Sequence, residues 1–233
     1  MRCRFIDTGF KNAFENMAID EALAMKCTSP ILRFYQWKPK AVSIGYNQNI
    51  NEICLDYCKK SNIDVVRRIT GGKAVFHDKE LTYSFIVPEK LDLLPKDVVG
   101  SYKTIAEALV IGLKQIGIKA EIKKITEKVK TPICFNSSNW YELLVKNKKI
   151  SGSAQRRLNG IILQHGSILM NFDYGMNSKI FKTDNENDAI EKLKQRITSI
   201  KNESRKNISI NELKKAVKSG FEERFGFDLV NSP

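Results

Sequence analysis

The sequence predicts an α+β protein in which mixed, largely antiparallel sheets are flanked by helices. Short runs of β-branched and aromatic residues follow one another through tight polar turns, and helical patterns are inserted among them without strict alternation. At 233 residues the chain can bury one sizeable core. We therefore expect a single domain over residues 1–233, with a charged helical C-terminal segment at about 186–233.

The first expected element is an amphipathic helix at residues 12–26. Apolar side chains recur there at spacings of three and four, and Asn12 is the expected N-cap. The expected buried face consists of Phe14, Met17, Ala18, Ala22 and Met25. The elements expected next are strands at 31–37 and 41–46 around a turn at 38–40, and a helix at 52–60 capped by Asn51.

A β-rich centre is expected at residues 63–88. It reads as strand, glycine turn, strand, polar turn and strand, and Pro88 ends the last strand because proline has no N–H for a ladder. A helix should follow from Ser101 to a C-cap at Gly117. The remaining expected elements are a polar loop at 136–138, a hairpin of strands 140–145 and 149–154 turned at Asn147, a buried strand at 161–170, and C-terminal helices with a capping box of Ser209 and Glu212.

The five cysteines are an odd number scattered through the chain, so we expect free thiols rather than a disulfide framework. Cys54 and Cys58 share a face of an expected helix, but the two histidines complete no familiar ligand spacing, and no metal site is expected. No apolar run approaches the roughly 20 residues that span a membrane. The N-terminus also lacks the apolar core of a signal peptide. We expect a cytoplasmic protein with no membrane partner.

The chain is strongly basic, with 39 Lys and Arg against 26 Asp and Glu, and a formal charge of +13. Such a charge suits an anionic partner. Nucleic acid is not expected, because the basic residues are spread along the whole chain and no nucleic-acid motif with aromatics at fixed spacing is present. A small acidic protein fits the charge equally well, and so does a lysine-rich solvated surface.

The segment RRITGGKAVFHD, residues 67–78, joins two expected strands through a diglycine. Glycine has no Cβ and can adopt positive φ, so backbone amides here can approach a ligand closely. The adjacent Arg67 and Arg68 can bind a phosphate, such as that of a pantetheine arm or a nucleotide. A bare Gly-Gly pair is more often an ordinary hairpin turn, and the whole segment in this order is far more specific.

This segment resembles one in the lipoate/biotin protein ligase superfamily, whose lipoate-handling members carry RR-x-x-GG-x-A-V-x-H-D. NMAIDEAL at 16–23 is similar to the family's first helix, and KKISGSAQRR at 148–157 to its lysine-bearing segment, so the resemblance covers about residues 5–172. It implies a catalytic domain of the biotin/lipoate protein ligase type. The substrate-binding residues expected from it are Arg68, Thr70, Gly71, Gly72, Lys73, Ala74, His77, Gly152, Ser153 and Ala154.

Two departures bear on how the acyl group is activated. Lipoate ligases usually show a third glycine and an H-D-x-G-N pattern, whereas this chain has Lys73 after the diglycine and HDKELTYS from His77. The segment PICF around Cys134, followed by WYEL at 140–143, is similar to the cysteine loop of bacterial octanoyltransferases outside the short class. The resemblance implies that Cys134 forms an acyl-enzyme, with Lys149 as its paired lysine, and no cofactor is expected.

The chemistry of the two side chains agrees with that implication. A thiolate exchanges thioester for thioester without ATP. A free thiol has a pKa of about 8.5, and a nearby cation such as Lys149 should lower it, while the neutral lysine can take the proton of an incoming amine. An N–H among the small residues Gly152, Ser153 and Ala154 can bind the oxyanion. The alternatives without a catalytic role are a buried structural cysteine for Cys134 and a solvated hairpin lysine for Lys149. For His77 and His165 the alternative is a structural histidine in a strand.

The expected function is octanoyl transfer from acyl carrier protein to a lysine of a lipoyl domain, in particular that of the glycine cleavage H protein. The resemblance supplies both partners, and both are acidic, which suits the basic chain. Three alternatives stay open. They are an ATP-dependent lipoate-protein ligase that would use Arg68, Lys73 and Lys149 to hold an acyl-adenylate, a lipoyl or octanoyl amidotransferase between carrier proteins, and a non-catalytic binding module.

Overall fold

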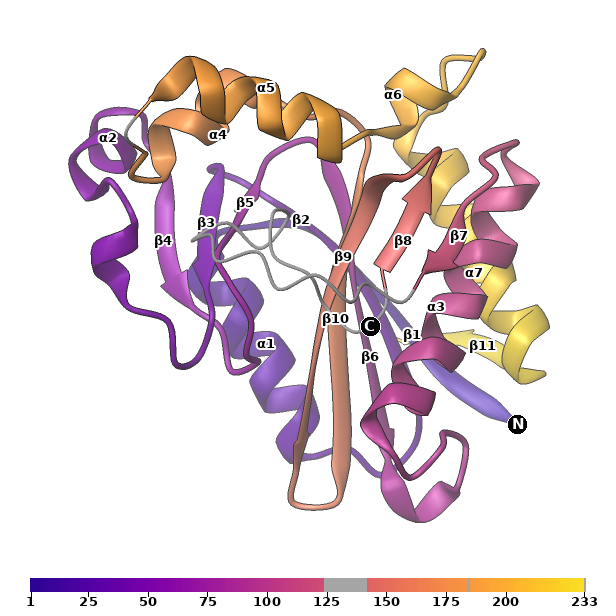
Figure 1. Cartoon of the computed structure of the whole chain (residues 1–233). Coiled ribbons are helices and arrows are strands. Elements are labelled where there is room, and N and C mark those ends of the chain that lie inside the picture. Colours follow the sequence, from indigo (N-terminus) through magenta and orange to yellow (C-terminus); the bar gives the residue numbers. More distant parts are fainter. Residues whose placement is uncertain (124–141, 184, 233) are drawn as a thin grey trace.

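Two β-sheets form the framework of the protein (Figure 1). The structure, a computed structural model, describes residues 1–123, 142–183 and 185–232. Within these residues the larger sheet runs in the order β11 (Asp228–Asn231), β1 (Arg2–Lys11), β2 (Ile31–Trp37), β6 (Glu80–Pro88), β10 (Ile161–Leu169), β9 (Lys148–Leu158), β8 (Glu142–Val145), β7 (Glu121–Lys123). The smaller sheet runs in the order β4 (Asp64–Arg67), β3 (Ala41–Ile44), β5 (Val75–His77).

The expected α+β class with mixed, largely antiparallel sheets is confirmed. Strand pairs β1–β2, β1–β11 and β3–β4 are parallel. The pairs around the long central strands β6, β9 and β10 are antiparallel. In the larger sheet the antiparallel strands thus form the centre, and β1 and β11, near the two ends of the chain, add the parallel pairs at one edge. The helices are α1 (Ala13–Met25), α2 (Leu55–Lys60), α3 (Val98–Gln115), α4 (Tyr174–Ile180), α5 (Glu186–Arg196), α6 (Ile200–Glu203) and α7 (Ile210–Phe225).

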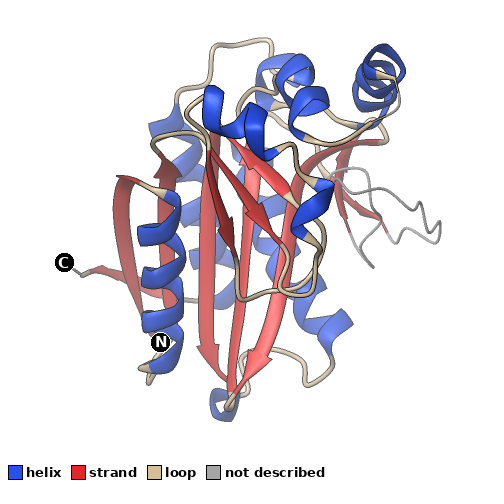
Figure 2. Ribbon diagram, turned by 90° about the vertical axis from the view of Figure 1, so that its left-hand side faces the viewer, coloured by secondary structure: helices blue, strands red, loops and turns tan. Residues whose placement is uncertain are grey.

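The main core lies between the larger sheet and the helix pair α3 and α7, which are labelled beside the sheet in Figure 1 and lie behind it in Figure 2. Phe34, Phe85 and Phe221 are fully buried in it. The two helices approach closely because glycines face each other, and a Cβ on Gly220 would lie 2.2 Å from the carbonyl oxygen of Ala108. Burying this apolar surface is the dominant stabilising contribution to such a layer.

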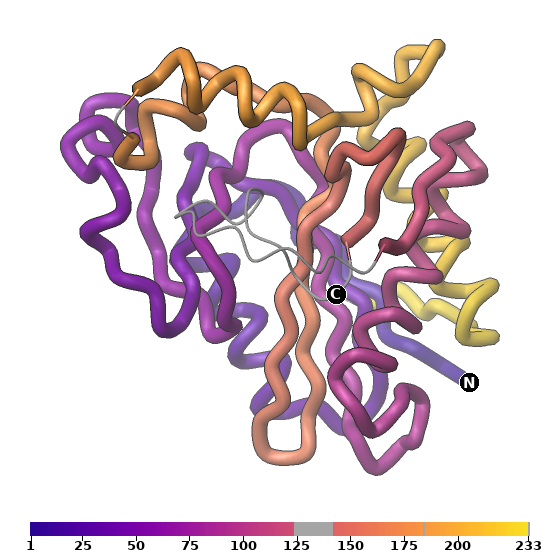
Figure 3. Tube along the Cα trace, viewed as in Figure 1, coloured from indigo at the N-terminus to yellow at the C-terminus, as the bar shows by residue number. Residues whose placement is uncertain are grey.

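The opposite face of the larger sheet carries α1 and the smaller sheet (Figure 3). Helix α1 contacts β2, β6 and β10 of the larger sheet and β3 and β4 of the smaller one. A second core joins the smaller sheet to α4 and α5, with Val42, Phe76, Phe181 and Leu193 among its buried members. Two chain segments, α1 and β3 to β5, are thereby placed over the same face of the central strands.

Several local predictions are confirmed. Asn12 caps α1 and forms a capping box with Glu15, and the Ser209–Glu212 capping box opens α7. Strand β6 ends at Pro88, and the β8–β9 hairpin turns at Lys146 and Asn147, both with positive φ. The four described cysteines are free thiols. The described residues contain no helix long and apolar enough to cross a membrane.

Other local predictions are wrong. The helix expected at 52–60 is a 3₁₀ turn, Ile50–Glu52, capped by Asn49 and followed by α2, which begins only at Leu55. Helix α3 begins three residues before Ser101, because the Asp97 side chain accepts from the backbone N–H of Gly100. The C-terminal segment is not wholly helical, since β11 pairs with β1, two strands whose pairing depends on residues more than 200 positions apart.

Candidate functional site

Helix α1 buries a partly polar face, and the buried face expected from its sequence is wrong. Of the five residues expected to be buried, only Met17 is, whereas Phe14 is 58% and Met25 is 78% exposed. Together with two alanines the helix buries Asn16 and Asp20, which are 0% and 1% exposed. Buried polar groups need hydrogen-bond partners, and here strand β2 supplies one in the fully buried Arg33.

Asp20 lies at the centre of a buried polar cluster. Its Oδ1 accepts from Arg33 Nη1 at 2.7 Å and from Ser84 Oγ at 2.8 Å. Its Oδ2 accepts from Tyr35 Oη at 2.9 Å and lies 3.1 Å from His165 Nδ1. Burial by itself would raise the pKa of the Asp20 carboxyl, but His165 and Arg33 hold it below its usual value. Asp20 is therefore a carboxylate that orients four side chains from three strands.

His165 connects this cluster to the glycine-rich loop through hydrogen bonds. Burial lowers the pKa of His165 below its usual value, although Asp20 opposes the shift. The ring is therefore neutral, with Nδ1–H donating to Asp20 and Nε2 accepting from Thr70 Oγ1 at 2.6 Å. Thr70 Oγ1 in turn accepts from Arg68 Nε at 3.1 Å.

A second network of buried hydrogen bonds is centred on His77. Glu80 Oε1 lies 2.6 Å from His77 Nδ1, and His77 Nε2 lies 2.7 Å from Ser43 Oγ. Trp37 stacks on the imidazole with ring centroids 4.0 Å apart. Thr82 donates to Glu80 Oε1 at 2.8 Å. All of these side chains are buried, so each hydrogen bond offsets the desolvation of two polar groups.

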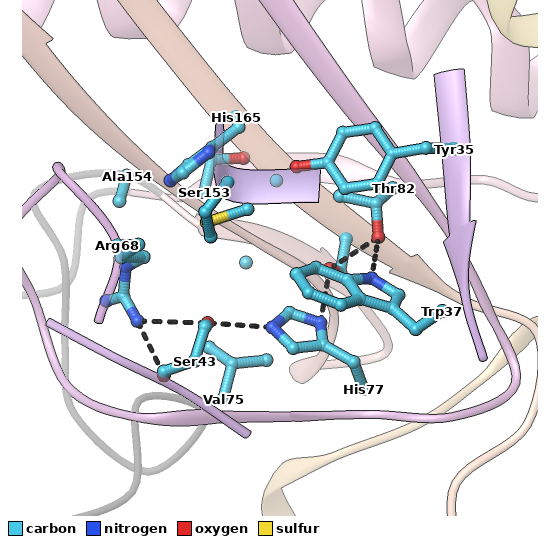
Figure 4. A pocket seen from close by; sticks show the side chains of 14 residues that line it. Tyr35, Trp37, Ser43, Arg68, Val75, His77, Thr82, Ser153, Ala154 and His165 are labelled. Carbon is cyan, nitrogen blue, oxygen red and sulfur yellow. Dashed lines mark hydrogen bonds between the residues drawn. The ribbon is translucent and has the colours of Figure 1, made fainter. Parts of the chain in front are cut away.

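A small cavity lies between these two networks of buried side chains (Figure 4). Its polar lining atoms are largely hydrogen-bonded within the protein, so the wall offers a ligand mostly carbon surface. Such a surface suits an apolar group. It is lined by Met17, Tyr35, Trp37, Ser43, Arg68, Val75, His77, Thr82, Gly152, Ser153, Ala154, His165, Gly166 and Ser167.

The arginines of the glycine-rich segment organise the loop itself. Arg68 donates from Nη1 to the Ser43 carbonyl at 2.9 Å, and from Nη2 to the carbonyls of Gly71 and Lys73 at 2.7 and 2.8 Å. Arg67 Nη1 donates to three carbonyls, those of residues 45, 46 and 48. In this structure these donors of the two guanidinium groups therefore bind backbone carbonyls, and the expected contact with a phosphate stays a prediction.

The diglycine is packed against a third glycine that the sequence did not single out. A Cβ on Gly45 would lie 1.8 Å from the Gly72 carbonyl oxygen, a distance that no side chain can occupy. Gly72 has a φ of +90°. The loop is thus held by a close backbone approach and by Arg68. It does not form a hairpin, because β3 lies between β4 and β5.

Lys149 is buried on β9, and a carboxylate faces it. Lys149 is 1% exposed, and its Nζ lies 2.7 Å from Oε1 of Glu142 on β8, which is 6% exposed. Cys134, the expected nucleophile, lies outside the described residues. The Cys134–Lys149 pair stays a prediction. No group of three or more His, Cys, Asp or Glu side chains that could hold a metal occurs in the described part of the chain.

The cavity brings together five of the predicted substrate-binding residues, Arg68, His77, Gly152, Ser153 and Ala154. Thr70 lies one hydrogen bond behind it, on His165. Ala74 is a core residue beneath the smaller sheet, and Lys73 is paired with Glu52 near the surface at 3.2 Å.

Several residues of this site escaped prediction, namely Asp20, Arg33, Tyr35, Trp37, Ser43, Glu80 and Glu142. The sequence contained one signal for this site. Asn16 and Asp20 lie four positions apart in an expected helix and therefore share a face, and such a polar face can be buried as well as solvated.

Comparison with known proteins places these features in context. A family model of the lipoyl protein ligase A/B catalytic domain matches residues 12–222. Octanoyltransferase LipM of Staphylococcus epidermidis is 41% identical over 241 residues, covering 97% of this chain and 87% of the relative. Octanoyltransferase LipM of Clostridioides difficile is 42% identical over 227 residues, covering 92% and 84%.

Solved structures of lipoate ligases share the fold. A bi-partite lipoate protein ligase from Thermoplasma acidophilum, described with its E2 lipoyl domain, matches with a TM-score of 0.84 at 27% identity, over 100% of this chain and 87% of that one. A lipoate-protein ligase A bound with ATP matches with a TM-score of 0.82 at 27% identity, over 100% and 89%.

Proposed function

The chain belongs to the lipoyl protein ligase A/B catalytic-domain family, and we propose that it is an octanoyltransferase of protein lipoylation. The observation that carries the proposal is the identity of about 40% to octanoyltransferases LipM over nearly the whole chain. The cavity supports it, because carbon surface backed by internally bonded polar groups suits a saturated acyl chain.

We further propose that acyl carrier protein is the donor and that a lipoyl domain, in particular that of the glycine cleavage H protein, is the acceptor. A lipoyl domain is named with the ligase from Thermoplasma acidophilum, which supports an acceptor of that class. The charge of +13 is suited to steering acidic partners.

The reaction we propose has two steps, through a thioester on Cys134. The Cys134 thiolate attacks the carrier thioester, and the carrier thiolate leaves and takes a proton from the Lys149 ammonium. The acceptor amine then attacks the Cys134 thioester and gives a proton to the neutral Lys149, and the Cys134 thiolate leaves. Protons balance over the cycle, and neither step uses ATP.

An ATP-dependent lipoate ligase is the main alternative, because lipoate ligases share the fold. An acyl-adenylate would be held by Arg68, Lys73 and Lys149. Arg68 donates to loop carbonyls, Lys73 pairs with Glu52, and Lys149 pairs with Glu142. All three cations thus have protein partners, with which an adenylate would have to compete.

The test is acceptor mass after incubation with three donors: octanoyl carrier protein without ATP, free lipoate with ATP, and octanoylated H protein. We expect the first to add one octanoyl group. Modification only with lipoate and ATP would establish a ligase, and modification only from octanoylated H protein an amidotransferase. Cys134→Ser should abolish the covalent intermediate, because a hydroxyl is far less acidic than a thiol.

The proposed dyad of Cys134 and Lys149 has a separate test. Lys149→Ala should shift the pH profile of Cys134 alkylation by iodoacetamide upward, since the cation that favours the thiolate is gone. Lys146→Ala is the matched control, because Lys146 lies on the same hairpin and is exposed. An unchanged profile in Lys149→Ala, with Cys134 located by peptide mass, would overturn the dyad.

A further inference from the structure

Glu142, in the WYEL segment after the cysteine loop, is the partner of the buried lysine on β9, and the resemblance assigns it no role. It is the first residue of β8, and Lys149 is the second residue of β9, so the two belong to one tight hairpin. The cross-strand register shifts between Leu143 and Leu144. Their side chains meet at 2.7 Å while both are nearly excluded from solvent.

The backbone of Lys149 is fixed as firmly as its ammonium. The Lys149 carbonyl accepts from the N–H of Thr198 at 2.9 Å, and Lys149 forms a parallel β-bridge with Ile197. The segment after α5 therefore holds the base of the side chain, and Glu142 holds its tip. A side chain fixed at both ends has little rotamer freedom left.

The other lysines of this described hairpin are placed differently. Lys146 is exposed and pairs with Glu203 at 2.9 Å, while Lys148 is half-buried and donates to the Lys194 carbonyl. Of the three, Lys149 alone is buried. A buried ion pair adds little net stability, because apolar side chains of the same volume stabilise a core as well or better. The pair is therefore poorly explained by stability alone and points to a use for the charge.

We propose that Glu142 is the positioning residue of Lys149 and fixes where its amine lies for the proposed transfer. The inference rests on the proposed function. The two side chains are 2.7 Å apart and nearly excluded from solvent, so this charge-assisted hydrogen bond sets the direction of the amine.

Glu142→Gln keeps the shape and the hydrogen-bond acceptor but removes the charge. Octanoyl transfer should lose at least about tenfold in kcat while KM for the octanoyl carrier stays within about twofold, because the amine is misplaced and the donor still binds. Glu203→Gln is the control, because it removes the same kind of charge from the exposed Lys146 and should leave kcat unchanged.

Glu142→Asp provides a second measurement if Glu142→Gln does not fold. It keeps the charge but withdraws it by one methylene, so kcat should again fall at least about tenfold at an unchanged KM. Wild-type kcat in either variant, or an equal loss in Glu203→Gln, would overturn the positioning role. Absence of octanoyl transfer in the wild-type protein would refute the proposed function instead.

Discussion

Replacing Asp20 with Asn should destabilise the protein strongly, because Asp20 is the charged centre of the buried cluster behind the cavity. The substitution keeps the shape of the side chain. It leaves Arg33, which is 0% exposed, without the anion that lies 2.7 Å away. It also turns one end of the side chain into an amide donor that faces the donors of Tyr35 and His165 or of Arg33 and Ser84.

The size of the effect follows from burial. Removing one partner of a buried ion pair costs about 3–5 kcal/mol in the free energy of unfolding. For a chain of this length, 1 kcal/mol corresponds to about 2–4 °C in Tm, so Tm should fall by roughly 6–20 °C. The fold should persist at low temperature, with the loss appearing as a lower midpoint of unfolding.

The assay is urea unfolding followed by circular dichroism, with Asp7→Asn as the matched control. Asp7 pairs with Lys214 at 2.8 Å, but both side chains reach solvent, so that change should cost less than about 1 kcal/mol. If Asp20→Asn costs no more than Asp7→Asn, Arg33 has found another partner or water. Asp20 would then not be the centre of the cluster.

Three further predictions concern the loop, the pH dependence and the charge. Gly45→Ala should lower the free energy of unfolding by at least about 1–3 kcal/mol, because its Cβ would meet the Gly72 carbonyl oxygen at 1.8 Å. The control is Gly175→Ala, whose Cβ would have its nearest neighbour 3.7 Å away and should not cause this overpacking loss. Equal unfolding midpoints of the two variants would refute the close approach. The free energy of unfolding should decrease as pH falls below about 6.5, because His165 takes up a proton there in the unfolded chain but not in the folded one, where its pKa is lowered. This loss continues until the pKa of His165 in the folded protein is passed. His165→Gln should reduce this pH dependence of the free energy of unfolding. Below about 3.8 the lowered pKa of Asp20 should add a second loss in the same direction. Raising the salt concentration should slow the proposed transfer by weakening the encounter with acidic carriers, and an apparent affinity independent of salt would reduce the charge of +13 to a solvated surface.

Much of the local structure could be predicted from the sequence, because its causes lie within a few residues of one another. The capping boxes at Asn12 and Ser209, the hairpin turn at Asn147 and the end of β6 at Pro88 each follow from backbone chemistry over two to four positions. The twelve residues from Arg67 to Asp78 likewise carried enough information to indicate the family.

What only the tertiary structure decided concerns partners that are distant along the chain. The sequence alone does not show that α1 buries Asn16 and Asp20 and exposes Phe14, because the reason is Arg33 on another element and His165, which is 145 positions away. Apolar periodicity predicts that a helix forms. It does not predict which face of the helix is buried when a buried charge on that helix needs a partner. The ion pair of Glu142 and Lys149 is different, because its members are only 7 positions apart, but its geometry depends on a register irregularity between β8 and β9 that the sequence does not reveal. A polar group leaves water only where its partner is already in place, and that position is a property of the assembled sheets.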